Sequence, residues 1–277
     1  VDGRVKGACY EEALVVFNDF WKDNAKLAKD LIARATLLRE KTSDFLKDKK
    51  LLKNVGAAKK AVSSKLAPVV GRTPPEEREL FIVEGDSAGG GCKRARDKSF
   101  QAVYPMKGKP LNVMDAKQDK INGNAEVTGL LAAIGADEKG KKGVPAILYG
   151  KIIIMADPDV DGSHITCLDF ATLWKYRPDL FRNGHIYVVK SPLYIAKKSG
   201  EVYFGDTKEQ IYEKAKTKNI NITYIKGWGE IDEEDLDVAL NPAVRTLYKV
   251  GPPKQNGVFE AILGKKPEAR KKLLGVA

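Results

Sequence analysis

Three aspartates at alternate positions after an apolar run are the residues in this chain best suited to chemistry. Asp157, Asp159 and Asp161 follow the run from Ile152 to Met155 within the stretch KIIIMADPDVDGSH. If extended backbone persists beyond this short buried strand, period-two alternation brings the three side chains to one side. Clustered carboxylates repel one another unless a cation or a shared proton offsets the repulsion. The stretch therefore predicts an all-oxygen site for a hard divalent ion, Mg²⁺ first.

Two alternatives compete with this interpretation. DPDVDG also satisfies the opening of an EF-hand loop, but the twelfth loop position is Leu168, where that motif needs a bidentate Glu. A buried strand, rather than a helix, leads into the loop. The second alternative is a solvated acidic turn with no ligand.

A fourth acid, Glu84, ends another predicted strand, ELFIVE at 79–84, and GDSAGGG follows at 85–91. Gly85 permits a tight turn into a helix. An acid at the carboxyl end of a strand, before such a turn, lies where open α/β sheets place active groups. In a parallel sheet Glu84 and Asp157 would share that edge and face one crevice.

The order of the expected elements predicts the fold class. Strands are expected at 79–84, 101–106, 152–155, 185–196 and 221–225, and helices at 122–134, 163–181, 206–216 and 232–240. This alternation predicts an α/β fold, with a mostly parallel sheet flanked by helices.

The region before the first strand differs in composition. Apolar residues recur at helical spacing from 10 to 40, and a Lys-rich stretch from 41 to 78 contains Pro74 and Pro75, which disfavour helix. We therefore expect a helical region, a basic linker and a domain boundary near residue 75.

Composition narrows the class of partner. The 277 residues are 43% hydrophobic and carry a formal net charge of +11. A basic chain with a focal acidic cluster suits an enzyme that acts on phosphodiesters, because cations hold the backbone and carboxylates hold the metal. We find no apolar run of about 18 residues and no signal pattern, so we expect a cytoplasmic chain without a membrane span. Three scattered cysteines predict reduced thiols.

Four motifs together resemble the Toprim domain of type IIA DNA topoisomerases, as found in the B subunits of bacterial gyrase and topoisomerase IV. They are EGDSAGG at 84–90, MKGKPLNV at 106–113, DPDVDGSH at 157–164 and KGWGE at 226–230. The resemblance implies a Rossmann-like Toprim domain over 76–250. It also implies the helical end of a transducer domain with its linker over 1–75, and a short B-subunit tail over 251–277.

The resemblance also implies roles for the acids. Glu84 would be a general acid/base at the ribose 3′ oxygen as well as a metal ligand. Asp157 and Asp159 would be Mg²⁺ ligands, and Asp161 a nearby ligand or a hydrogen-bonding neighbour of the ligands. Mn²⁺ or Ca²⁺ would be able to replace Mg²⁺ in binding.

Basic and amide side chains in these motifs are implied DNA contacts. Cations there would pair with phosphates without reading bases. The candidates are Lys107, Lys109, Asn112 and Lys226, together with Lys93, Arg94 and Arg96, for which a solvated surface is an equal alternative.

Double-stranded DNA and an A-type breakage-reunion subunit are the implied partners, in an A2B2-type heterotetramer of the bacterial nucleoid or a phage-infected cell. None of the ten tyrosines has the Arg-Tyr context of the cleavage nucleophile, and no GxxxxGK[ST] P-loop is present. We expect ATP to bind only in a domain outside this chain, and we expect this polypeptide alone not to cut DNA. A Toprim nuclease or primase and a non-catalytic DNA-binding fragment are the alternatives.

The sequence departs from the family pattern beside the acids. Pro158 stands between two of them and removes an N–H. Trp228 stands where relatives usually carry an aliphatic residue. These departures, and the short span from 195 to 225, suit a divergent bacterial or bacteriophage enzyme.

Overall fold

The computed structural model describes residues 12, 15, 16, 19–27, 29, 30, 49–138, 146–255, 257–273 and 275. The chain divides into two compact units, Val1–Asp48 and Lys49–Ala277. In the first unit the described residues are helical apart from a turn at Asn24, as the periodicity predicted. The remainder of the helical stretch expected at 10–40 lies outside the described residues.

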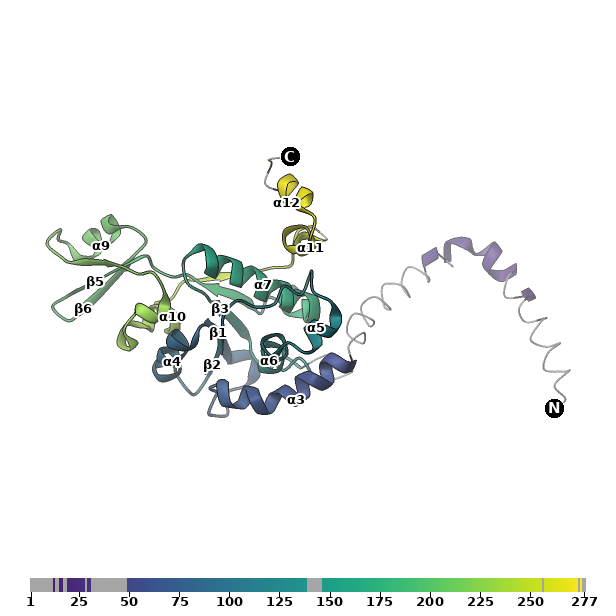
Figure 1. Ribbon diagram of the computed structural model, residues 1–277, viewed down its shortest axis with the longest axis horizontal. Coiled ribbons are helices and arrows are strands. Elements are labelled where there is room, and N and C mark those ends of the chain that lie inside the picture. Colours follow the sequence, from purple (N-terminus) through teal and green to yellow (C-terminus); the bar gives the residue numbers. More distant parts are fainter. Residues whose placement is uncertain are drawn as a thin grey trace. The chain divides into compact units, whose positions relative to one another are not determined.

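A five-stranded sheet forms the centre of the second unit, in the order β2-β1-β3-β4-β8 (Figure 1). Its strands are β1 (Glu79–Glu84), β2 (Gln101–Met106), β3 (Lys151–Met155), β4 (Ile186–Val189) and β8 (Leu247–Lys249). The first four are parallel, and β8 pairs antiparallel with β4. The expected α/β fold with a mostly parallel sheet is confirmed.

Both faces of this sheet are covered, which explains why its strands read as continuous apolar runs. Leu80 and Ile82 of β1 point into one core, and Phe81 and Val83 into the other. The first core includes residues of α3 (Lys49–Lys65), α5 (Gln118–Asn122), α6 (Ala125–Ala133), α7 (Val160–Tyr176), α8 (Pro178–Arg182) and α11 (Val258–Leu263). The second includes residues of α4 (Asp86–Ala95), η3 (Trp228–Glu230) and α10 (Asp237–Leu240), together with Leu236, which directly follows η4 (Glu233–Asp235).

Two further short helical elements belong to this unit. They are η1 (Pro75–Glu77), directly before β1, and α12 (Pro267–Leu273), which contacts α11. No helix in the described part of the chain has the length and apolarity that a bilayer crossing requires.

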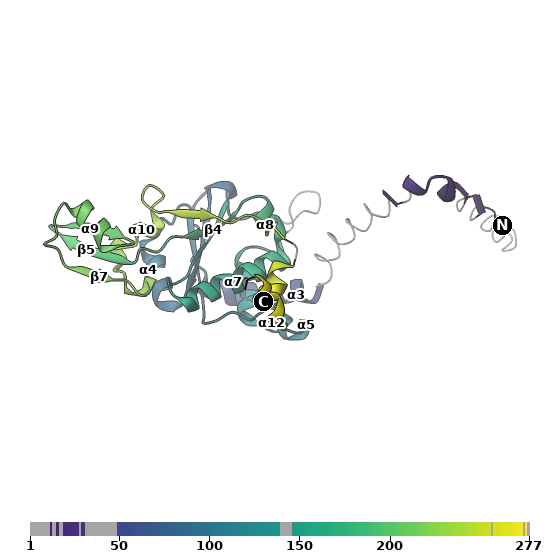
Figure 2. The ribbon, with the colours of Figure 1, turned by 90° about the horizontal axis from the view of Figure 1, so that it is seen from above.

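A smaller antiparallel sheet was not expected from the sequence. It comprises β5 (Tyr194–Lys198), β6 (Glu201–Gly205) and β7 (Ile222–Tyr224), with α9 (Lys208–Ala215) beside β6. This sheet lies at one end of the unit, away from α3, in both views (Figures 1 and 2). The single strand expected at 185–196 is therefore wrong. The chain leaves the large sheet after Val189, and Pro192, which cannot donate to a ladder, lies in the connection.

The division between the units also differs from the expected boundary near residue 75. Residues 49–65, which we expected to lie in a linker, form α3, and this helix packs mainly against α6. Its apolar residues Leu51, Val55 and Val62 are buried in the same core as the sheet. The high lysine content suggested a linker, although a narrow stripe of apolar residues recurs at helical spacing. The assignment of residues 1–75 to the end of a transducer domain stays a prediction.

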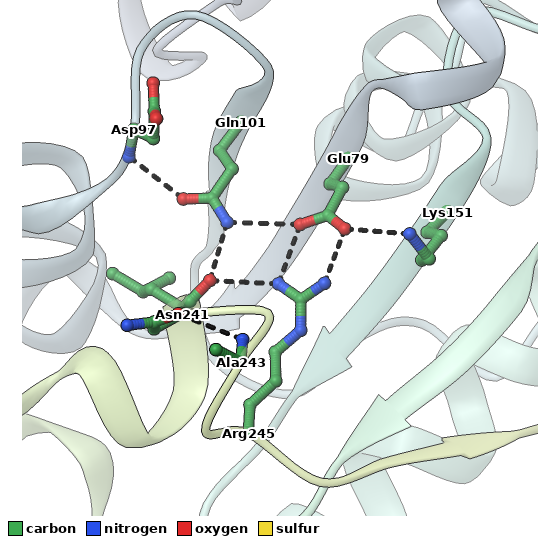
Figure 3. Close-up of polar contacts among 8 residues, drawn as sticks. Glu79, Asp97, Gln101, Lys151, Asn241, Ala243 and Arg245 are labelled. Carbon is green, nitrogen blue, oxygen red and sulfur yellow. Dashed lines mark hydrogen bonds and ion pairs between the residues drawn. The ribbon is translucent and has the colours of Figure 1, made fainter.

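A buried ionic network joins three strands at the amino edge of the large sheet (Figure 3). Glu79, Gln101 and Lys151 are the first residues of their strands, and Glu79 pairs in register with both others. Gln101 Nε2 and Lys151 Nζ donate to the Glu79 carboxylate at 3.1 and 3.0 Å, and Arg245 donates to both of its oxygens. Burial acts to raise the pKa of Glu79, but the hydrogen bonds and charge of Arg245, with the hydrogen bonds from Gln101 and Lys151, outweigh it and leave that pKa below its ordinary value.

We expect Arg245→Met to destabilise the protein strongly, because the Glu79 carboxylate is only 2% exposed and would lose its bidentate partner. Breaking such a buried pair typically costs about 3–5 kcal/mol, and Lys151 and Gln101 should keep the loss near the lower value. Urea unfolding measures it. The double variant Glu79→Leu/Arg245→Met removes both charges and should be more stable than Arg245→Met alone. A double variant as unstable as the single one would contradict this account.

Candidate metal and nucleic-acid site

Glu84 and Asp157 meet at the carboxyl edge of the large sheet. Glu84 is the last residue of β1, and Asp157 follows the end of β3 by two residues. The parallel register places Val83 opposite Met155, so the two strands end side by side. The backbone N–H of Asp157 donates to Glu84 Oε2 at 3.1 Å. The two acidic motifs therefore come together as their positions at parallel strand ends predicted.

The acids at this edge disfavour one another's ionised forms. Burial raises the pKa of Glu84, the N–H of Asp157 opposes this, and the charges of Asp157, Asp159 and Asp161 add to the increase. Burial likewise raises the pKa of Asp157, against the hydrogen bond from Trp228, and the charge of Asp159 adds to it. A bound cation would relieve this repulsion. The donor set is thus chemically suited to a hard divalent ion.

The expectation that backbone alternation gathers all three aspartates is wrong. β3 ends at Met155, the chain bends at Pro158 and Asp159, and the Asp159 side chain caps α7 by accepting from Gly162 N–H at 2.7 Å. Asp161 then lies in the first helical turn, is exposed, and pairs with Lys109 at 2.8 Å. Among the described residues, no group of three or more His, Cys, Asp or Glu side chains is arranged to hold a metal ion.

The KGWGE loop, residues 226–230, lies against Asp157. Trp228 is buried and donates its backbone N–H to Asp157 Oδ1 at 2.9 Å. Lys226 and Glu230 are exposed, and the N–H of Lys226 donates to Glu230 Oε2 at 3.1 Å. The loop thus reaches the carboxylate of Asp157 through the backbone N–H of Trp228.

The candidate DNA contacts of the KGK segment differ in exposure. Lys107 is exposed just beyond β2, and Lys109 is held by Asp161. Asn112 donates to the carbonyl of Leu263 at 2.7 Å and accepts from Met114 N–H, so its amide joins this segment to α11.

Two of the three candidate basic residues at the end of α4, Arg94 and Arg96, have partners within the protein. Arg94 pairs with Glu233, and the Arg96 guanidinium donates to the carbonyls of Gln101, Lys93 and Pro68. Burial lowers the pKa of Lys93. A DNA role for these three residues stays a prediction, and Lys107 and Lys226 are better placed for one.

Asp169 is a buried acid that the sequence analysis missed. It lies in α7 with 1% exposure, and its Oδ1 has no hydrogen-bond partner among the described residues. Burial raises the pKa of Asp169 to about 8, and the charges of Glu84 and Glu126 add to the increase. Only an acid within an otherwise apolar helical pattern could have drawn attention to it.

Residues 79–190 match the model of the Toprim domain. The chain is 39% identical over 208 residues to the DNA gyrase B subunit of Spiroplasma citri, covering 71% of this chain and 32% of the relative. It is 35% identical to the DNA topoisomerase 4 B subunit of Caulobacter vibrioides, covering 91% and 38%. The chain thus spans about a third of the length of these relatives.

A solved structure shows the same relationship. The DNA-binding, cleavage and re-ligation domain of Plasmodium falciparum topoisomerase II matches with a TM-score of 0.61 and 26% identity. The match covers 76% of this chain and 30% of that one. The Toprim match begins at the first residue of β1 and includes both acidic motifs.

We expect Asp169→Asn to change how stability depends on pH. In the unfolded chain Asp169 ionises near pH 4, but in the folded protein its pKa is about 8. Stability should therefore fall as pH rises from about 4 to 8, because only the unfolded state releases the proton in that range. Asn cannot ionise. The melting temperature of the variant minus that of wild type should increase from pH 5 to pH 8, and a difference independent of pH would refute the assignment.

Proposed function

We propose that this chain, whose residues 79–190 are a Toprim domain, is the DNA cleavage and religation module of a type II DNA topoisomerase. The chain is related over most of its length to the B subunits of DNA gyrase and topoisomerase IV. It would act with the tyrosine of an A-type partner subunit on double-stranded DNA. The observation that carries the proposal is the meeting of Glu84 with Asp157 at the carboxyl edge of the sheet.

Glu84 and Asp157 would hold Mg²⁺, with Asp159 beside them. Mg²⁺ in nucleotide-processing sites commonly takes one or two carboxylates, several waters and phosphate oxygens, so a complete protein cage is not required. When bound, the ion would stabilise negative charge at the scissile phosphate and its 3′ oxygen. Asp161, which pairs with Lys109, would lie farther from the ion than these three acids and would add negative charge near it.

Glu84 would also move a proton. As the tyrosine oxygen of the partner bonds to phosphorus, its own proton passes to solvent water, the bond from phosphorus to the 3′ oxygen breaks, and Glu84 donates a proton to that 3′ oxygen. Resealing reverses both changes, and Glu84 recovers the proton. In the absence of a metal ion, burial and the neighbouring carboxylates raise the pKa of Glu84, which favours the protonated form that a general acid needs.

Exposed cations in the same motifs would hold the DNA backbone. Lys107 and Lys226 are exposed, and Lys109 is placed by its ion pair with Asp161. Phosphate contacts of this kind fix the register of a duplex without reading its sequence. The formal net charge of +11 favours such a partner.

The remaining parts of the reaction would come from elsewhere in the assembly. The relatives are about three times as long as the region that this chain matches. ATP binding would belong to a separate domain, the tyrosine to the A-type subunit, and the complete enzyme would be an A2B2-type heterotetramer.

We expect DNA cleavage only when this protein is mixed with its tyrosine-bearing A-type subunit, Mg²⁺ and supercoiled DNA. Denaturing the reaction should trap a covalent adduct between DNA and the A-type subunit, because this chain supplies no nucleophile. Gel analysis after protease treatment measures the adduct. Free-ended cuts made by this protein alone would instead support a Toprim nuclease.

We expect Glu84→Gln to slow both cleavage and resealing, since Gln cannot exchange the proton. General acid/base catalysis contributes about 10²- to 10⁴-fold, which sets the expected size of the loss. Rapid-quench measurements of both directions test it. The control Glu77→Gln makes the same change at an exposed position near the opposite, amino edge and should leave both rates unchanged. Normal resealing by Glu84→Gln would contradict the acid/base role.

A further inference from the structure

We propose that the KGWGE loop sets the position of the Asp157 carboxylate, with Gly227 and Trp228 as positioning residues. The inference rests on the proposed function in so far as it treats Asp157 as a metal ligand. It assigns the centre of the loop to the metal site, whereas Lys226 at its start is a candidate for DNA phosphate.

Trp228 anchors the loop to the end of β3 through two hydrogen bonds. Its backbone N–H donates to Asp157 Oδ1 at 2.9 Å, and its indole Nε1–H donates to the carbonyl of Ala156 at 2.8 Å. The side chain is 1% exposed and belongs to the second core of the sheet. One residue therefore holds both the backbone that precedes Asp157 and the carboxylate itself. An aliphatic residue at this position would keep only the backbone bond.

Gly227 lets the loop approach this carboxylate. Its backbone is extended, with φ −162° and ψ 162°, so any residue would tolerate the conformation. A Cβ atom at Gly227, however, would lie 2.5 Å from Asp157 Oδ2 and 2.9 Å from Oδ1. The position needs glycine because of the carboxylate, and not because of its backbone angles.

These contacts leave Asp157 able to bind a cation. A carboxylate offers about four lone-pair directions, and the Trp228 N–H occupies one of them. Loss of a partner that orients a metal-binding side chain in this way typically lowers metal affinity by about 10- to 100-fold. The loop would thus fix the direction in which the free lone pairs of Asp157 point.

The loop is tied to a neighbouring segment at its start and closed by a hydrogen bond between its two ends. Ile225, just before it, donates its N–H to the carbonyl of Leu193 at 2.9 Å, next to the smaller sheet. Glu230, at its end, accepts from the N–H of Lys226, which closes the loop on itself. A loop held in this way can limit where the Asp157 carboxylate lies.

The test uses Gly227→Ala, which places a methyl group against the carboxylate without straining the backbone. We expect Mn²⁺ binding, measured by electron paramagnetic resonance on the full chain, to weaken by about 10- to 100-fold. The melting temperature without metal should stay close to that of wild type. Gly229→Ala is the matched control, because the nearest neighbours of its Cβ are Ser87 and Ala88. It should leave Mn²⁺ affinity unchanged.

A double-mutant cycle separates positioning from general damage to the loop. In an Asp157→Ala background the clash is gone, so adding Gly227→Ala should cause no further loss of Mn²⁺ affinity. A second loss of the same size would show that Gly227 acts through something other than Asp157 and would overturn the inference. Equal Mn²⁺ affinity of Gly227→Ala and wild type would also overturn it, and would leave the proposed function intact.

Hydrogen exchange of the metal-free protein gives a readout that does not depend on the proposed function. The backbone N–H of Trp228 should exchange faster in Asp157→Ala than in wild type, because its acceptor is removed. Its indole N–H, bonded to Ala156, should keep its protection. If wild type binds no Mn²⁺, the proposed function fails. Hydrogen exchange then still tests whether the Trp228 N–H is bonded to Asp157. Equal exchange of the Trp228 N–H in both proteins would overturn the inference even if Mn²⁺ binds.

Discussion

The parallel register between β1 and β3 is the constraint on which the site depends. It sets Val83 opposite Met155, so that Glu84 and the chain after β3 leave the sheet together. The hydrogen bond from Asp157 N–H to Glu84 then joins two acids that are 73 residues apart in sequence. A slip of one residue would move every strand side chain to the opposite face and destroy both cores. The apolar packing that stabilises the sheet therefore also sets the spacing of the site.

Buried carboxylates are paired with cations at the amino edge of this sheet but lie beside other carboxylates at its carboxyl edge. At the amino edge Glu79 is matched by Arg245 and Lys151, and its pKa lies below the ordinary value. At the carboxyl edge the pKa values of Glu84 and Asp157 are raised by burial and by neighbouring carboxylates. Compensated charge serves stability, whereas uncompensated charge favours binding of a cation.

Residues after the Toprim match return to the sheet at both edges. The match ends at residue 190, but Trp228 reaches Asp157 and Arg245 reaches Glu79. The smaller sheet lies in the chain between residue 190 and the first of these returns. The later part of the chain thus completes a domain whose central strands are already paired.

The sequence by itself determined the central strands, the α/β class and the shared edge of Glu84 and Asp157, because apolar runs and strand-end motifs are local signals. It did not determine where Asp161 points, since a cap at Asp159 starts the helix one residue later. The core position of α3, the burial of Asp169 and the approach of Gly227 to Asp157 were decided only by the tertiary structure. Each of these depends on contacts between segments far apart in the chain, and local periodicity carries no information about such contacts.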